Sequence, residues 1–356
     1  MVYGRGKPRL RYILDVPPEM VDQVNKLLQV RSDRYRTPQD FIVAAIQNQL
    51  YLEFQEPGWS LESQKMDTGD YARPAISLNN AIQLLQLSPD LSHVKTFPLS
   101  DSSRPDLLWG QYNRIFPVKV VTRIAANLGR IKALEYFPLA VLYQESAEIA
   151  RQLGKTIARA ETKMGRKRGE IISAGLPIGR AQDKARSRFQ THFVGHLSRR
   201  NIGNEIKFRV EGAAPALKFL EIDRRDDSVV AGVTDYGLKF ACLPNPVIDS
   251  QDYSTPFSSE EVSFLLDHIA SQLPEEAKLV RLILSCIKKG IATPEDLNAQ
   301  MKSAYPKWRG SEPATMRAGV VSRISELGLL DREKDGVKVT YKLTDLGEEY
   351  LARLAD

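Results

Sequence analysis

Cysteine and histidine are scarce in this chain, whose 356 residues include two cysteines and four histidines. Cys242 and Cys286 are too few for a disulfide framework, which predicts reduced thiols and a location in the cytoplasm or on the nucleoid. No apolar run approaches the length of a membrane span, and the N-terminal segment MVYGRGKPRLRY lacks the apolar core of a secretory signal. We therefore expect no membrane partner.

The usual patterns of enzymatic sites are also missing. His192 and His196 stand four residues apart, but no glutamate occupies the position that a hydrolytic zinc motif needs, and no third ligand is evident. No phosphate-cradling Gly-x-x-x-x-Gly-Lys loop is present. The sequence therefore predicts neither an enzyme nor a bound metal or cofactor. Asp223, Asp226 and Asp227 leave a metal-dependent nuclease as an alternative, although two of them are expected in an exposed turn.

Positive charge, in contrast, is in excess and is concentrated. The chain carries 50 Lys and Arg against 44 Asp and Glu, a net charge of +6, which favours anionic partners. Fifteen of these cations, but only four of the acids, lie between Arg151 and Arg209, so this segment has a charge of +11 and the remainder −5. Solvated helix faces can also be basic, but such a concentration is typical of a polyanion-binding site.

The segment from Lys7 to Phe54 shows a pattern of one strand followed by two helices. Apolar and polar residues alternate over Arg9–Val16, which predicts a strand, and Pro17-Pro18 ends it. A helical period follows, and Thr37 with Pro38 begins a second helix. One strand and two helices cannot bury all their apolar faces, so we expect a second copy of the chain to cover them.

This order, with Pro-Pro-Glu-Met after the strand and Thr-Pro-Gln-Asp before the second helix, resembles the ribbon-helix-helix family of DNA-binding proteins. The resemblance covers about one seventh of the chain. It implies a homodimer whose paired strands lie in the major groove of DNA, with base contacts from Arg9, Arg11 and Ile13. It also implies phosphate contacts from Arg5, Lys7 and the amides around Thr37. Asp15 does not fit this pattern, and a module that only dimerises is the alternative.

A second pattern occurs twice, 110 residues apart. Two predicted strands, Leu217–Asp223 and Val229–Val233, precede a Thr-Asp-x-Gly segment at Thr234. The strands Leu329–Asp331 and Val337–Leu343 precede the second such segment. In each case the threonine is expected to cap a following helix, and the glycine allows close packing.

Strand pairs with helices before and after them resemble the winged helix-turn-helix family. In the C-terminal copy, we predict helices over Leu279–Lys289, from Thr293 onward, and over Pro313–Leu327. If this copy binds DNA, the resemblance implies groove or phosphate contacts from Thr315, Arg317, Ser322, Arg323, Lys334 and Lys338. Because many winged helices serve only in packing, a protein partner is an equal alternative.

In the first copy, the helix in the recognition position is predicted over Gln182–Arg200. Phe189, Phe193 and Leu197 would be buried in it. The polar residues left for phosphate contact are Lys184, Arg186, Arg188, Gln190, Arg199 and Arg200. Pro244-Asn245-Pro246 is expected to be a hinge between the two copies. After it, Ser258-Ser259-Glu260-Glu261 is expected to cap a helix over Val262–Gln272 that links them.

These expectations combine into a mainly α protein with small β elements. We predict a ribbon-helix-helix domain (1–56), a linker with a short helix (57–105), a basic winged-helix-like domain (106–250) and a C-terminal winged-helix domain (251–356). The implied function is homodimeric, sequence-specific binding of double-stranded DNA, as a transcriptional regulator of a prokaryote, archaeon or mobile element. An architectural or assembly component of a partition, transposition or defence complex is the alternative.

Replacing Arg11 with alanine is expected to cost roughly 1–3 kcal/mol of DNA-binding free energy and to relax specificity, because a base contact is lost. Dissociation constants on a preferred and a random duplex measure this. An equal loss on both duplexes would contradict base reading by Arg11.

Overall fold

The computed structural model describes residues 84–100, 107–167, 170–179, 182–202, 205–225, 228–336 and 338–354. The chain divides into two units, Met1–Thr68 and Gly69–Asp356, and all these residues belong to the second. The expected ribbon-helix-helix domain and most of the expected linker therefore lie outside the described residues. The boundary predicted at residue 250 falls inside the second unit.

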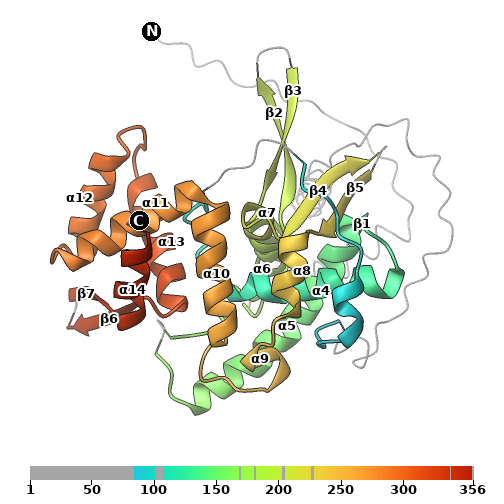
Figure 1. The fold of residues 1–356 in the computed structure, drawn as a ribbon, viewed down its shortest axis with the longest axis horizontal. Helices are drawn as coiled ribbons and strands as arrows, with labels where there is room; N and C mark the ends of the chain where they lie inside the picture. The colour runs from blue at the N-terminus through green and yellow to red at the C-terminus, as the bar shows by residue number, and fades with distance from the viewer. Residues whose placement is uncertain are drawn as a thin grey trace, which may run out of the picture. The chain divides into compact units, whose positions relative to one another are not determined.

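The second unit is mainly helical with small antiparallel sheets, as expected (Figure 1). We call residues 107–258 the first lobe. Its three-stranded sheet has the order β1-β5-β4, and a separate pair is formed by β2 and β3. The elements of this lobe are α4 (Phe116–Lys132), β1 (Phe137–Pro138), α5 (Leu139–Lys163), α6 (Gln182–Phe189), a π-helical turn (Gln190–Val194), β2 (His196–Ile202), β3 (Glu205–Glu211), α7 (Ala213–Ala216), β4 (Leu220–Arg225), β5 (Ser228–Val233), α8 (Asp235–Cys242) and α9 (Pro246–Asp249).

Residues 259–354 form the second lobe, in which four helices precede a hairpin and one helix follows it. A Ser258 to Glu261 capping box begins its linking helix, as the sequence predicts. Thr293 likewise caps the helix after it by accepting from the Asp296 amide. The elements are α10 (Ser259–Gln272), α11 (Pro274–Lys288), α12 (Pro294–Ala304), α13 (Glu312–Glu326), β6 (Leu330–Asp335), β7 (Lys338–Leu343) and α14 (Asp345–Arg353). Among the described helices, none is long and apolar enough to cross a membrane.

The repeat predicted from the Thr-Asp-x-Gly segments is confirmed as repeated hydrogen bonding. The Thr234 hydroxyl accepts from the Gly237 amide at 3.1 Å and donates to the Lys218 carbonyl at 2.5 Å. The same two bonds recur 110 positions later, at 3.1 and 2.7 Å, among Thr344, Gly347 and Gly328. Each threonine thus joins the helix after its hairpin to the residue before the hairpin.

The glycine of each segment permits a close approach between the helix and the chain entering the hairpin. A Cβ atom added to Gly237 would lie 2.0 Å from the Phe219 carbonyl oxygen. One added to Gly347 would lie at the same distance from the Leu329 carbonyl oxygen. Because no side chain fits there, both positions require glycine.

The helix predicted over Gln182–Arg200 is wrong in its second half. Helix α6 ends at Phe189, a π turn follows, and strand β2 begins at His196. Phe189 and Phe193 are buried as expected. Gly195 then adopts φ 105°, which is incompatible with continuing a helix.

The segment Pro244-Asn245-Pro246 is not a hinge, because buried polar contacts hold it in place. Asn245 is 1% exposed, and its side chain donates to the Pro256 carbonyl and to the Glu261 carboxylate, both within 3.0 Å. Glu261 in turn pairs with Lys119 of α4 at 2.7 Å, and both side chains are fully buried. Burial lowers the pKa of Lys119 to about 8, although Glu261 opposes this shift. The junction between the lobes is therefore fixed.

His268 of α10 belongs to an aromatic cluster that also joins the lobes. Its ring lies 4.8 Å from the Phe219 ring and 5.0 Å from the Tyr236 ring. Its Nε2 atom lies 2.7 Å from the Leu217 carbonyl oxygen, so Nε2 carries the proton of a neutral imidazole. Burial lowers the pKa of His268 to about 4.

This lowered pKa predicts a loss of stability in mild acid. Below pH 6.5 the unfolded chain takes up a proton that folded His268 excludes until about pH 4. The free energy of unfolding should fall over this window, by up to about 3 kcal/mol. Urea titrations at pH 7.5 and pH 4.5 measure the fall, and the His268→Gln variant should show a smaller one. The same pH dependence in both proteins would contradict the assignment.

Candidate nucleic-acid interface

Strands β2 and β3 form a two-stranded antiparallel ribbon that extends away from the rest of the first lobe (Figure 1). Seven residues of each strand pair, from His196 opposite Glu211 to Ile202 opposite Glu205. Two residues, Gly203 and Asn204, connect the strands. The ribbon is therefore a paired element that projects from the body of the lobe.

Two glycines and two tyrosines define the base of the ribbon. Gly195 and Gly212 adopt φ values of 105° and 130°, and a Cβ atom on Gly212 would lie 2.3 Å from the Gly195 Cα atom. Tyr143 of α5 donates its hydroxyl to the Gly195 carbonyl at 2.6 Å. The Tyr112 hydroxyl accepts from the Gly212 amide at 2.9 Å. The ribbon therefore leaves the lobe from a fixed, tightly packed base.

Because side chains alternate along a strand, the register divides the residues of the ribbon between two faces, one that packs on the lobe and one that we call the open face. The opposite face is covered near the base, where Val210 is buried and Leu197 packs on the core. Farther out on that covered face, the Arg224 guanidinium lies 5.8 Å from the centre of the Phe208 ring. By this register, the positions on the open face are 196, 198, 200 and 202 of β2 and 205, 207, 209 and 211 of β3, which include two arginines, one lysine and two glutamates.

The predicted phosphate contacts of the first lobe fall in two places. Lys184, Arg186 and Arg188 are exposed on α6, as expected. Arg199 is exposed on β2, and Arg200 follows it in the ribbon, although its side chain lies outside the described part. Gln190 is half-buried, and its amide donates to the Tyr143 carbonyl at 3.1 Å. The Gln190 side chain therefore makes a contact within the protein and does not belong to the exposed surface of α6.

Of the six residues of the second lobe that were predicted to contact DNA, some are exposed and others make contacts within the protein. Thr315 on α13 and Lys334 and Lys338 on the hairpin are exposed, and Ser322 is half-buried. The remaining two, Arg317 and Arg323, make internal contacts. Arg317 donates to Asn298 at 3.1 Å and to the Tyr341 hydroxyl at 3.2 Å. The expectation that Arg323 is available to DNA is wrong, because its side chain is 2% exposed.

Arg323 instead clamps the segment 107–115, which we call the strap, onto the second lobe. It pairs with Glu276 of α11 at 2.5 Å. It also donates to the carbonyls of Leu108, Trp109 and Tyr112, at 3.2, 3.4 and 2.8 Å. The Glu276 carboxylate accepts from the Leu108 amide at 3.1 Å. Each charge of this buried pair thus has hydrogen-bond partners in the strap.

Glu326, at the end of α13, fixes the other end of the strap. Its carboxylate accepts from the amides of Ile115 and Phe116, at 2.6 and 3.1 Å, where α4 begins. Burial raises the pKa of Glu326, and these amides and Arg114 oppose the shift. A carboxylate at the start of a helix is also favoured by the helix dipole.

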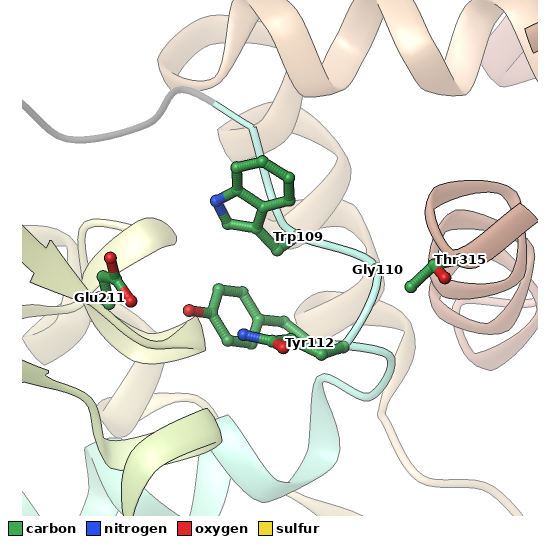
Figure 2. Close-up of a pocket in the computed structure, with 6 residues that line it drawn as sticks. Trp109, Gly110, Tyr112, Glu211 and Thr315 are labelled. Atoms are coloured by element: carbon green, nitrogen blue, oxygen red, sulfur yellow. The ribbon is translucent and has the colours of Figure 1, made fainter. Parts of the chain in front are cut away.

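An open pocket of about 220 Å³ lies between the ribbon base, the strap and α13. Figure 2 shows the Tyr112 hydroxyl directed toward the side that bears Glu211, and Gly110 on the side of Thr315. Glu211 accepts from the Ser198 hydroxyl at 3.0 Å and lies 3.8 Å from His196 Nε2. The pocket therefore lies where the strap contacts both the base of the ribbon and α13.

Two possible metal sites were considered from the sequence, the His192 and His196 pair and the Asp223 group. The described residues do not form either site. His192 lies in the π turn, whereas His196 begins β2, so they do not share a helix face. Asp223 lies at the outer part of β4 and pairs with Arg225 at 3.1 Å, whereas Asp226 and Asp227 lie outside the described residues. No group of three His, Cys, Asp or Glu side chains suited to a metal ion occurs among the described residues.

Comparisons with known proteins identify no relative: no family model, no curated protein and no solved structure matches this chain.

Sequence reasoning missed the ribbon, although a signal for it exists. The helical spacing of Phe189, Phe193 and Leu197 favoured one continuous helix. Gly203-Asn204 between two polar and apolar stretches is a two-residue hairpin signal. This signal could have identified the ribbon.

Replacing Arg323 with alanine is expected to lower the free energy of unfolding by roughly 3–5 kcal/mol, because Glu276 would stay buried without its partner. The control is Arg353→Ala, which breaks an exposed pair with Asp267 and should change stability by about 0.5 kcal/mol or less. Denaturant unfolding measures both variants. Similar small losses would show that the Arg323 clamp does not stabilise the fold.

Proposed function

We propose that this chain is a homodimeric, sequence-specific protein that binds double-stranded DNA. The observation that carries the proposal is the concentration of positive charge in residues 151–209. Within this segment, exposed cations lie on the last part of α5, on α6 and on the ribbon. Phosphate groups are the natural partners of such an array, and they supply most of the affinity in DNA binding.

The domain plan supports the proposal further. Each lobe has a helix, a second helix, a helical turn or helix, a hairpin and a capped helix. This is the order of a winged helix-turn-helix domain, and we propose that both lobes are of this type. In the second lobe, Lys334 and Lys338 of the hairpin would bind phosphate, whereas Arg317 and Arg323 of α13 make contacts within the protein.

The homodimer rests on the N-terminal sequence alone. Its strand and helices resemble a ribbon-helix-helix domain, in which two chains form one sheet. Arg9, Arg11 and Ile13 would read bases there. As a regulator, the protein would hold one DNA site through this domain and the neighbouring DNA through its basic lobe.

An architectural or assembly role is the second candidate. The exposed cations of the basic lobe would serve it equally well, because phosphate contacts carry no sequence information. A scaffold would bind preferred and random duplexes with equal affinity, whereas a regulator would bind its preferred sequence roughly a thousandfold or more tightly.

Replacing Arg186 and Arg188 with serine is expected to weaken binding to all duplexes alike. The slope of log affinity against log salt concentration should fall by up to about 2, because two phosphate contacts are lost. The matched control replaces Lys95 and Lys132, which are exposed elsewhere in the second unit. Fluorescence anisotropy at several salt concentrations gives the slopes. The same slope for both variants would contradict phosphate binding by α6.

A further inference from the structure

The pocket of about 220 Å³ at the base of the ribbon is lined by three separate segments of the chain. The strap, the end of β3 and α13 supply the lining residues, which are Trp109, Gly110, Gln111, Tyr112, Glu211 and Thr315. Figure 2 shows the Trp109 and Tyr112 rings on the same side of the strap, with Glu211 facing them. Two aromatic rings and one carboxylate therefore border the same space.

The walls of the pocket are held in place by contacts within the protein. A Cβ atom on Gly110 would lie 2.2 Å from the Thr315 carbonyl oxygen, so the strap and α13 are in direct backbone contact. The Gly110 amide donates to the Met316 sulfur at 3.1 Å. Tyr112 is 2% exposed, and its hydroxyl accepts from the Gly212 amide. A ligand that enters a pocket with ordered walls avoids the entropic cost of ordering them.

The charge of the pocket lining differs from that of the surface around it. Among the described residues that line the pocket, Glu211 is acidic and none is Lys or Arg, although the adjoining segment 151–209 has a charge of +11. The half-buried Glu211 carboxylate accepts from the Ser198 hydroxyl at 3.0 Å. A carboxylate offers about four lone-pair sites, so it can accept this bond and also attract a cation.

The Glu211 charge acts on the aromatic wall of the pocket. Burial raises the pKa of Tyr112, and the negative charge of Glu211 adds to this shift, whereas the Arg209 charge opposes it. The Tyr112 hydroxyl and the Glu211 carboxylate therefore lie within electrostatic range of each other.

The chemistry of the lining selects one class of ligand. The face of an aromatic ring attracts a cation that lies within about 6 Å, and tryptophan attracts it most strongly. An anion would need a basic residue in the lining. A metal ion such as calcium needs several oxygen ligands, and no group of three metal-binding side chains occurs in the described part of the chain. An organic cation fits, because its apolar groups can pack on the rings while its charge faces the carboxylate.

We propose that the pocket at the ribbon base binds a small organic cation with an ammonium group, between the Trp109 and Tyr112 rings and the Glu211 carboxylate. The exposed Gln111 and Thr315 side chains offer hydrogen bonds to a polar group of the ligand. The bound cation contacts both the base of the ribbon and α13. This site is separate from the surfaces assigned to DNA and does not rest on the proposed function.

The test measures binding of choline to the full chain by ligand-detected NMR, in which magnetisation passes from the protein to a bound ligand. The matched control is the neutral analogue of choline, in which a carbon atom replaces the ammonium nitrogen. We expect choline to bind about tenfold or more tightly than this analogue, because the two have the same shape and only choline carries the charge. Equal binding of the two compounds, or no binding of choline, would overturn the proposal.

Two variants remove the proposed contacts. Glu211→Gln keeps an acceptor for Ser198 but removes the charge, and Trp109→Leu removes the larger ring. Each should weaken choline binding about tenfold.

The matched controls lie outside the pocket. Glu148→Gln changes a half-buried carboxylate of α5, and Trp308→Leu removes a half-buried ring that stacks on Tyr305. Both should leave choline binding unchanged. Thermal melting shows whether each variant is folded, and Glu211→Gln decides the test if Trp109→Leu is not. Equal weakening by the pocket variants and their controls would contradict the site, whereas DNA binding by the unaltered chain tests the proposed function separately.

Discussion

The buried ion pair between Arg323 and Glu276 is the interaction on which the relation between the lobes depends. Both charges are removed from water, which is unfavourable unless each is paired and hydrogen-bonded. The strap supplies these hydrogen bonds from the carbonyls of Leu108, Trp109 and Tyr112 and from one amide. Tyr112 continues the connection, because its hydroxyl accepts from the base of the ribbon at Gly212. One buried charge pair thus orders the strap, and the strap joins α13 to the ribbon base.

The two lobes share one local architecture around the hairpin, but they differ in the element that precedes it. The hairpin, the threonine cap and the close glycine recur with a shift of 110 residues, so the local architecture is the same. In the second lobe the helix before the hairpin is long, and its Arg317 and Arg323 side chains bind partners within the protein. In the first lobe this helix is reduced to one turn, and a basic ribbon leaves from its start. If the lobes bind DNA as we propose, the first lobe makes the main contacts and the second supports it.

Much of the fold could be predicted from the sequence, because the signals for it are local. The caps at Ser258, Thr293 and the two Thr-Asp-x-Gly segments act within three residues, and all were confirmed. The candidate site was predicted less well. The cations of α6 are exposed as expected, but the spacing of Phe189, Phe193 and Leu197 extended the helix too far. Gly195 ends it with a backbone conformation that spacing does not reveal.

By itself the sequence determined the mainly helical class, the repeated hairpin plan and the concentration of charge, since caps, turns and composition depend on neighbouring residues. Only the tertiary structure decided which charges face solvent and which face the protein. Arg323 reads as a surface residue on its own helix, yet its carbonyl partner Tyr112 lies 211 positions earlier in the chain. Asn245 reads as part of a hinge, yet Glu261 and Pro256 hold it in place. The burial of a polar group depends on partners that only the folded chain brings together, and no local pattern specifies them.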